Sequence, residues 1–466
     1  MTKIEQVIHY VDQQLKSRRL TPGMRLPSVR SLAKQLNFSV STVVNAYERM
    51  LSMGLIESRA GSGFFVCAPL EPLILSHIEP IQDQNLDPLK ISRQLLEASS
   101  FLIKAGCGWL PDDWMPHEAL RKAIRDTSKD SVFELMNYSS PLGLSSLREL
   151  LARRLHTKDI NVTPEQILLT DSGSYSIDLI CRFLLKPGDT VLLDDPCYFN
   201  FRALLKVHQV KVISVRYTPD GPDIEAFKQA IIEHHPRLYI TNSGIHNPTG
   251  ATLSQSKAHQ LVSLIEHANM VVVEDDIFSD FETSASPRLS ALDGLKNSIY
   301  IGSFSKTLSA SLRCGYIVTK SEWIDYLIDL KVATSFSHNN FSAHVLYKIL
   351  THGGYRKHIE QLKIRLADAM IISIHRLEKI RIQPWIRPKA GIFLWCELPT
   401  DINIQKLMSY CTEKGVILAL GNSFGEAHTF QNFLRFNIAQ CMHPDFFNIL
   451  EDAMQYASMN RPLNSL

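Results

Sequence analysis

Lys306 stands in a short polar segment, residues 303–316, that directly follows the apolar run of residues 298–302. The segment places one amine among hydroxyl side chains, and the guanidinium of Arg313 follows seven positions later. An amine in this setting suits a covalent bond to an aldehyde beside a phosphate group. Taken alone, the segment is equally typical of an ordinary surface loop, so its chemistry depends on what the fold brings beside it.

Four more polar segments each follow a short apolar run. They are residues 171–175, 194–198, 241–250 and 274–278. The apolar runs predict strands at residues 166–169, 190–193, 211–215, 237–240, 271–273 and 299–301. Helical patterns fill the gaps, which predicts an α/β body with a mainly parallel sheet and helices on both faces. Because ligands bind at the carboxyl ends of such strands, we expect the five polar segments to meet at one edge.

The five segments together contain each group that pyridoxal phosphate requires. The aldehyde of this cofactor needs an amine, its ring nitrogen a carboxylate, and its phenolic oxygen a hydrogen-bond donor. Its ring face needs an aromatic side chain, and its phosphate needs amides, hydroxyls and a cation. A carboxylate beside the pyridinium raises the pKa of the ring nitrogen and so preserves the electron sink of the cofactor. Each single group is common in helix caps and ion pairs, but the ordered set predicts a pyridoxal phosphate site.

The first 66 residues predict a separate, small α+β domain. Apolar side chains at helical spacing predict a helix over residues 4–15, a second after the N-cap Ser28, and a third over residues 40–51 with Val40 on its apolar face. The opposite face of the third helix is polar. Residues 54–58 and 63–66 flank a glycine-tipped turn, which is typical of a two-stranded wing. The pattern predicts a winged helix-turn-helix with a recognition helix that suits a DNA major groove.

This domain resembles the winged helix of the GntR family of bacterial regulators. The matching motifs are residues 26–30, 42–43, 46–47, 54–56 and 61–66. The resemblance implies that these residues approach DNA: Arg30, Ser39, Ser41, Thr42 and Gly63. Val40 and Val44 stand where relatives often carry arginine, so we also expect contacts from Arg25, Asn45 and Arg59. A winged helix that contacts only protein is the alternative.

The charge of the chain is unevenly distributed. Residues 1–66 carry nine Lys or Arg against four Asp or Glu, a net +5, whereas the remaining residues have a net charge of −3. A basic head on a mildly acidic body indicates that the head alone meets a polyanion, although solvated charge is the alternative. A structural binder of the nucleoid fits poorly, because the basic excess is confined to this small domain.

Composition sets the outer limits of the fold. A chain of 466 residues with 45% hydrophobic residues can bury a large core and divides into two or three domains. It contains no run of the roughly 20 apolar residues that a membrane span needs and no signal-peptide pattern, which predicts a soluble, cytoplasmic protein without a membrane partner. The eight cysteines are scattered without a CxxC pair, so neither disulfides nor a metal site is expected.

Residues 68–100 predict a linker between the head, residues 1–67, and the body. Four prolines interrupt this segment, and it contains at most one short helix, near residues 91–98. Proline would make the linker a semi-stiff spacer, and disorder is the competing interpretation.

The body, residues 101–458, resembles the fold-type I aminotransferases of class I and II. The resemblance makes Lys306 the Schiff-base lysine, Asp275 the partner of the ring nitrogen, Asn247 the donor to the phenolic oxygen and Tyr198 the residue that stacks on the ring. It assigns the cofactor phosphate to Ser174, Tyr175, Ser303, Ser305 and Arg313.

Three further residues take their meaning from the same resemblance. Tyr138 matches the tyrosine that reaches the phosphate of the neighbouring subunit, which implies a homodimer with shared sites. Arg435 matches the arginine that binds a substrate carboxylate, and it would belong to a small C-terminal α/β subdomain of about residues 340–458. Phe278 stands where relatives usually carry a tyrosine whose hydroxyl bonds the phenolic oxygen, which puts catalytic efficiency in doubt but not cofactor binding.

In this order, the two domains resemble the MocR subfamily of GntR-type regulators. The resemblance implies a bacterial transcriptional regulator that binds promoter DNA as a dimer, lies with the nucleoid when so bound, and senses an amino compound or pyridoxal phosphate. The alternative is a working class I/II aminotransferase with an accessory DNA-binding head, because the groups for full or half transamination are all present. The sequence leaves the effector, the operator and the direction of regulation open.

Overall fold

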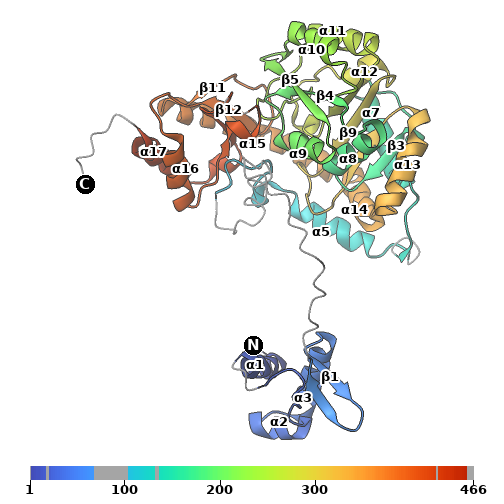
Figure 1. The fold of residues 1–466 in the computed structure, drawn as a ribbon, viewed down its shortest axis with the longest axis vertical. Coiled ribbons are helices and arrows are strands. Elements are labelled where there is room, and N and C mark those ends of the chain that lie inside the picture. Colours follow the sequence, from blue (N-terminus) through green and yellow to red (C-terminus); the bar gives the residue numbers. More distant parts are fainter. Residues whose placement is uncertain (1, 17–19, 68–102, 132–135, 427–428, 459–466) are drawn as a thin grey trace. The chain divides into compact units, whose positions relative to one another are not determined.

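The computed structural model describes residues 2–16, 20–67, 103–131, 136–426 and 429–458. The chain divides into two compact units, residues 1–82 and residues 83–466, and each is described by itself (Figure 1). The predicted linker at residues 68–100, with its short helix near residues 91–98, lies outside the described residues.

The first unit is a three-helix domain with a β-hairpin. Its elements are α1 (Lys3–Lys16), α2 (Val29–Leu36), α3 (Val40–Ser52), β1 (Ile56–Arg59) and β2 (Gly63–Val66). As predicted, Ser28 caps α2, its side chain accepting from the Ser31 N–H at 3.2 Å. Val43 and Tyr47 of α3 lie in the buried core, but Val40 is 49% exposed, so the prediction that it packs inward was wrong. Val40 is the first residue of α3, one turn before the stripe that packs on the other helices.

A sheet of eight strands forms the centre of the second unit. The strands are β3 (Ile167–Thr170), β4 (Thr190–Asp195), β5 (Lys211–Thr218), β6 (Gly221–Pro222), β7 (Leu238–Thr241), β8 (Val271–Asp275), β9 (Ser298–Ser303) and β10 (Gly315–Val318). Their order is β3-β10-β9-β8-β7-β4-β5-β6. The pairs from β9 through β5 are parallel, whereas β10 is antiparallel to both β9 and β3. All six predicted strands are confirmed within a few residues, but the short β6 and β10 were missed.

Helices cover both faces of this sheet (Figure 1). Successive side chains of a strand point to opposite faces. On one face, Val191 and Leu193 of β4 belong to a core that includes α8 (Gly173–Leu184), α9 (Phe199–Val207) and α13 (Ser321–Ser335). On the other face, Leu192 packs with α10 (Ile224–His234), α11 (Gln255–His267) and α12 (Leu289–Asp293). Beside these helices, β3 packs with α7 (Ser145–His156) and α14 (Asn340–Thr351), which also contacts α5 (His117–Thr127).

A second, smaller sheet follows in the C-terminal part. Its strands are β11 (Gln383–Pro384), β12 (Phe393–Glu397), β13 (Ala419–Leu420) and β14 (Phe433–Asn437), in the order β11-β12-β14-β13. Three helices share its core: α15 (Gly354–Lys379), α16 (Ile404–Glu413) and α17 (Phe446–Ala457). Residues 103–110 contribute to the same core, and Ile103 forms an isolated parallel bridge with Val416, just before β13. The small head and the large α/β body with a second sheet confirm the predicted fold class.

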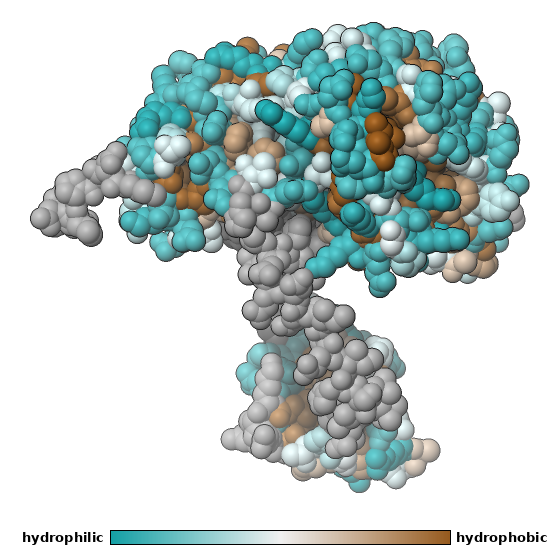
Figure 2. All heavy atoms as spheres, turned by 45° about the horizontal axis from the view of Figure 1, so that its top comes forward, coloured by the Kyte–Doolittle hydropathy of each residue, from teal (hydrophilic) through white to brown (hydrophobic). Residues whose placement is uncertain are grey.

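The surface of the larger unit is mostly polar on the side that Figure 2 presents. Figure 2 shows the visible face of the larger unit covered mostly by hydrophilic residues, with apolar residues in separate small groups. Among the described residues, no helix is both long enough and apolar enough to cross a membrane.

Tyr217 of β5 and Tyr239 of β7 are two buried tyrosines that differ in the hydrogen bonding of their hydroxyls. Tyr217 stacks on His246 with ring centroids 3.7 Å apart, and within the described residues its buried hydroxyl has no hydrogen-bond partner. The Tyr239 hydroxyl donates to Asp194 at 2.6 Å. We expect Tyr217→Phe to raise the free energy of unfolding by about 1 kcal/mol, because it removes an unsatisfied buried group.

Tyr239→Phe is the matched control, since it removes the same atom from a fully buried ring. We expect it to lower the free energy of unfolding by about 2 kcal/mol, because the Asp194 carboxylate loses a donor. Urea unfolding of the full chain compares the two midpoints. Equal losses in both variants would contradict this account.

Candidate active site

A cavity of about 610 Å³ lies at the carboxyl ends of the central strands. Seven of the predicted cofactor residues line it: Ser174, Tyr198, Asp275, Ser303, Ser305, Lys306 and Arg313. The other predicted residues of the body, namely Tyr138, Tyr175, Asn247, Phe278 and Arg435, are not among the lining residues. The fold therefore brings most of the expected groups together at the expected edge of the sheet.

Lys306 follows β9 and points its amine to the backbone of a distant segment. Its Nζ donates to the carbonyl oxygen of Gly108 at 2.7 Å. Burial, assisted by the positive charge of Arg435, lowers the pKa of the Lys306 amine to about 8, while Cys107 and Asp275 act in the opposite direction. A substantial share of this amine is therefore neutral, and nucleophilic, near pH 8.

Asp275 is the middle one of three consecutive acids at the end of β8. Its carboxylate lines the cavity and accepts from the Ile277 N–H at 3.2 Å. Burial raises the pKa of the Asp275 carboxyl to about 7, although the Ile277 N–H and the Asn242 amide oppose this rise. A cationic group beside Asp275 would lower that pKa again, so the site favours a positively charged partner.

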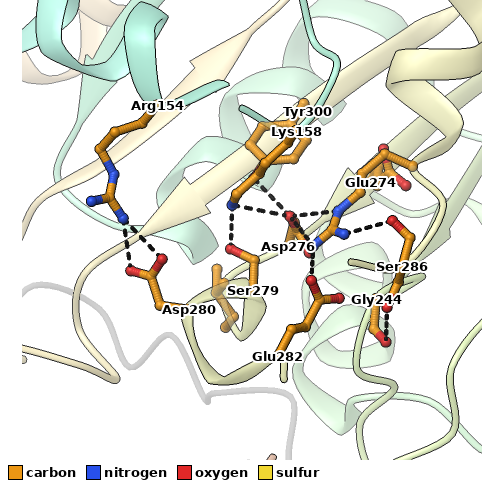
Figure 3. A network of polar contacts seen from close by, with 12 residues as sticks. Arg154, Lys158, Gly244, Glu274, Asp276, Ser279, Asp280, Glu282, Ser286 and Tyr300 are labelled. Atoms are coloured by element: carbon orange, nitrogen blue, oxygen red, sulfur yellow. Dashed lines mark hydrogen bonds and ion pairs between the residues drawn. The ribbon is translucent and has the colours of Figure 1, made fainter. Parts of the chain in front are cut away.

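The two acids beside Asp275 have other partners, as Figure 3 shows for Asp276. Asp276 accepts from the Arg288 guanidinium at 3.2 Å and from the Tyr300 hydroxyl at 2.7 Å, and Lys158 lies 3.5 Å away. Glu274 accepts from the Ser243 hydroxyl and from two backbone N–H groups at the start of α12, at 2.8 and 2.9 Å. Because both neighbours are held outside the cavity, only Asp275 can serve it.

The predicted phosphate residues lie around the start of α8 and the end of β9. Ser174 is exposed at the first turn of α8, and Ser303 and Ser305 share a hydrogen bond of 2.6 Å between their hydroxyls. Arg313 is exposed, with a positive φ of 46°. The Tyr175 N–H already donates to the capping hydroxyl of Ser172 at 3.0 Å, so a phosphate would have to share that donor.

Arg435 and Asn247 form a buried pair next to the cavity. Arg435, on β14, is 2% exposed and donates to the Asn247 side-chain oxygen at 2.9 Å and to the Gly106 carbonyl at 2.6 Å. Its guanidinium lies between the rings of Phe393 and Phe424, at 4.2 and 4.6 Å from their centroids. Burial lowers the pKa of Arg435 to about 10, so it remains a cation at neutral pH.

Two predicted residues lie away from the cavity lining. Phe278 is buried against Phe393, with ring centroids 5.4 Å apart, and packs with the core of the smaller sheet. Tyr138 is 78% exposed, and its ring contacts that of Phe336, with centroids 4.9 Å apart. The role of Tyr138 at a neighbouring subunit stays a prediction.

The predicted DNA-contacting residues of the head lie on α2, on α3 and the residue before it, and on or beside the hairpin. Arg25, Arg30, Ser39, Ser41, Asn45 and Arg59 are exposed, while Thr42 and Gly63 are half-buried. Ser39 caps α3, accepting from the Thr42 N–H at 3.2 Å. Arg59 pairs with Glu57 at 2.6 Å, and a side chain at Gly63 would lie 3.4 Å from the Arg25 guanidinium. Arg25 thus lies beside the wing glycine.

Comparison with known protein families identifies both units. Residues 3–66 match the gntR family of bacterial regulatory proteins, and residues 109–451 match aminotransferase class I and II, which is well over half of the chain. The chain belongs to the aminotransferase class I and II family. The two matches confirm the predicted fusion of a GntR-type helix-turn-helix domain with an aminotransferase domain, an arrangement consistent with the MocR subfamily.

Relatives along the whole chain carry regulator names. An uncharacterized HTH-type transcriptional regulator, YdfD of Bacillus subtilis, is 28% identical over 94% of this chain and 93% of its own length. The HTH-type transcriptional regulator NorG of Staphylococcus aureus is 26% identical over 85% of this chain and 91% of its own. The alpha-aminoadipate aminotransferase LysN of Thermus thermophilus shares the fold of the body, with a TM-score of 0.72 and 23% identity over 78% of this chain and 94% of that one.

The aminotransferase-like site also contains groups that the sequence did not indicate. The carbonyls of Gly106 and Gly108 hold Arg435 and Lys306, and Asn437 holds the segment that carries them. The close spacing of Gly106 and Gly108 is the one sequence signal that could have pointed to this segment. A side chain at Gly106 would collide with the backbone of Ala419 at 2.3 Å.

The lowered pKa of Lys306 gives a direct prediction. Competitive labelling with acetic anhydride, read by peptide mass spectrometry, should give half-maximal reactivity near pH 8, against about pH 10.4 for an ordinary lysine. Arg435→Met should move the midpoint to higher pH, because it removes a nearby positive charge. Arg356→Met, a change at an exposed arginine of α15, is the control and should leave it unchanged. A Lys306 midpoint near pH 10 in the unaltered chain would refute the assignment.

Proposed function

We propose that this protein is a pyridoxal phosphate-dependent transcriptional regulator. It binds promoter DNA as a homodimer through the winged helix and senses an amino compound, or the cofactor itself, through the aminotransferase-like body. The observation that carries the proposal is the presence in one chain of a GntR-type head and a cavity where Lys306 and Asp275 meet. The proposed organisation is a head at residues 1–67, a linker at residues 68–100 and a body at residues 101–458.

The residues around the cavity fit pyridoxal phosphate. When bound, this cofactor supplies an aldehyde that bonds covalently to an amine and a cationic ring that withdraws electrons. Lys306 would hold the aldehyde carbon, and Asp275 would bind the ring nitrogen, whose positive charge would offset the buried carboxylate. Tyr198 would cover the ring, and Ser174, Ser303, Ser305 and Arg313 would bind the phosphate, with Tyr138 of a second subunit.

The amino ligand would be held through its carboxylate. Arg435 is a buried cation whose planar guanidinium can bind a carboxylate in a two-pronged contact. Its present partners, the amide oxygen of Asn247 and the Gly106 carbonyl, are neutral, so a carboxylate competes well for the same donors. Asn247 would then be free to turn its amide toward the phenolic oxygen of the cofactor.

A working aminotransferase is the second candidate. The same cavity favours it, because Lys306 has a partly neutral amine near pH 8 that could move protons at a ligand carbon. The two functions differ in what is observed. Specific promoter binding that changes with an amine or with pyridoxal phosphate supports the regulator, whereas multiple turnovers with amino and keto acids and no specific DNA binding would support the enzyme.

The head should show two separable kinds of DNA contact. Chromatin mapping of the full-length protein would first supply a promoter fragment. We expect Asn45→Ala to lose about 1 to 3 kcal/mol of discrimination between that fragment and unrelated DNA, because an amide can read a base edge. We expect Arg30→Ala to weaken binding to both DNAs and to reduce the salt slope by about 1, as the loss of one phosphate contact does.

Arg356→Ala is the control for both head variants, because Arg356 is an exposed arginine of α15 in the body. Gel-shift titrations at several salt concentrations measure all three variants. Affinity for the fragment that is unchanged in both head variants would contradict the proposed DNA surface.

Cofactor binding is tested by absorbance. The unaltered protein should develop the visible absorbance of a covalent lysine adduct with pyridoxal phosphate, and Lys306→Ala should not. Phe278→Tyr should shift the pH titration of that absorbance, because it places a hydroxyl where relatives bond the phenolic oxygen. Phe281→Tyr is the matched control, since Phe281 lies in the same core but not at that position. An unchanged titration in Phe278→Tyr would remove the role given to this position.

A further inference from the structure

Residues 103–110, here called the strap, cross from the smaller sheet to Lys306. At one end, the Ile103 N–H donates to the Gly415 carbonyl at 2.8 Å, and the Ile417 N–H donates back to the Ile103 carbonyl at 2.8 Å. The Gly106 N–H donates to the Ile417 carbonyl, also at 2.8 Å. The strap is therefore bonded through its backbone to the segment that leads into β13, the strand that pairs with β14 at Arg435.

Asn437 holds the strap from one side. Its side-chain amide donates to the carbonyls of Cys107 and Trp109, at 3.1 and 2.8 Å, and its backbone N–H donates to the Ala105 carbonyl at 2.6 Å. The side-chain oxygen of Asn437 is itself fixed, because it accepts from the Ala439 N–H at 3.1 Å. Asn437 is fully buried, and only one orientation of its amide places the oxygen at a backbone N–H and the nitrogen at two carbonyls.

The alternate carbonyls of the strap go to the two cations of the ligand site. The Gly106 carbonyl accepts from Arg435 at 2.6 Å, and the Gly108 carbonyl accepts from Lys306 at 2.7 Å. The carbonyls of residues 105, 107 and 109 go to Asn437, and those of residues 106 and 108 go to the site. The strap thus lies between Asn437 on one side and, on the other, two side chains that are expected to change partners when the site is occupied.

We propose that the strap couples the chemical state of Lys306 and Arg435 to the chain segment that leads to the winged helix. The inference rests on the proposed function and deepens it by naming the element that carries the signal. Ile103 is joined in sequence, through residues 68–102, to the head. A shift of the strap therefore displaces the point from which that segment starts.

The chemistry at Lys306 supplies the first part of the signal. Lys306 would hold the aldehyde carbon of the cofactor through a C=N bond, and both hydrogens of the neutral amine would leave with the aldehyde oxygen as water. Because the nitrogen of an unprotonated C=N bond has no hydrogen, the Gly108 carbonyl would lose the donor that it has here. If a ligand amine replaced Lys306 in the C=N bond, the two hydrogens of that amine would pass to Lys306, and the bond to Gly108 could form again.

Arg435 supplies the second part. A ligand carboxylate competes with the Gly106 carbonyl for the guanidinium. Cofactor alone thus frees the strap at Gly108, and cofactor with an amino acid frees it at Gly106 instead. The two states hold the strap differently, as a switch requires, because a ligand shifts only an equilibrium between states that it binds unequally.

Hydrogen exchange of the full-length chain, read by mass spectrometry, tests the proposal with pyridoxal phosphate as the probe. We expect exchange at the strap amides, those of Ile103 and Gly106 among them, to rise about fivefold on addition of the cofactor, as the loss of one hydrogen bond would give. This sign is opposite to the protection that a bound ligand gives to the cavity wall. Cofactor absorbance that develops without any rise in strap exchange would overturn the proposal.

Variants separate the strap from the cofactor site. Lys306→Met removes the donor to Gly108, so strap exchange should already be raised without cofactor and should not change on its addition. If no cofactor absorbance develops in the unaltered chain, the proposed function fails. The comparison of Lys306→Met with the unaltered chain would still show whether Lys306 holds the strap. Unraised exchange in that variant would refute the role of Lys306 in holding it.

Transmission is tested at Asn437, which we assign as a positioning residue. Asn437→Asp replaces the amide NH2, which donates to both carbonyls, by a carboxylate oxygen that can only accept. The variant should keep the cofactor absorbance but lose the change in promoter affinity that the cofactor produces. Asn403→Asp is the matched control, because Asn403 caps α16 through its side-chain oxygen, which aspartate retains. An affinity change in Asn437→Asp equal to that of the unaltered chain would overturn the coupling.

Discussion

The body depends on the burial of two cations, Lys306 and Arg435, within one small region. A buried charge without partners is costly, and these two repel each other, which the lowered pKa of Lys306 reflects. Asp275, the carboxylate whose charge acts on Lys306, accepts from an N–H of its own loop. Backbone carbonyls therefore serve both cations, and the strap is placed where its carbonyls at Gly106 and Gly108 can do so.

This arrangement suits a ligand whose chemical groups are complementary to Lys306, Asp275 and Arg435. Burial moves the pKa of Lys306 down to about 8 and that of Asp275 up to about 7, so each group is displaced toward its neutral form. A ligand with an aldehyde near the amine and a cationic nitrogen near the carboxylate would offset the cost of burying both groups. Arg435 remains charged and is available to an anion. Each of the three groups therefore suits a different part of the ligand.

Much of this could be predicted from sequence, because hydrophobic runs place the strands and strand order places their ends. Asp275 separates from its two acidic neighbours by the alternation of side chains along β8. The strap could not be predicted in the same way, since its function lies in backbone carbonyls that every residue carries. Strand β10 was hidden because its first residues read as part of the polar segment after Lys306. The prediction that Val40 is buried was wrong because hydrophobic periodicity does not show which turns of a helix contact the neighbouring helices.

The strap also bears on the choice between a sensor and a fast catalyst. An enzyme that made and broke a C=N bond at Lys306 would rearrange the Gly108 contact in every turnover, but it would not need that contact to be connected to the head. A regulator needs that rearrangement, because a signal exists only if occupied and empty sites hold some connecting element differently. The element that meets both cations, Asn437 and the chain toward the head is the one best placed to carry such a difference.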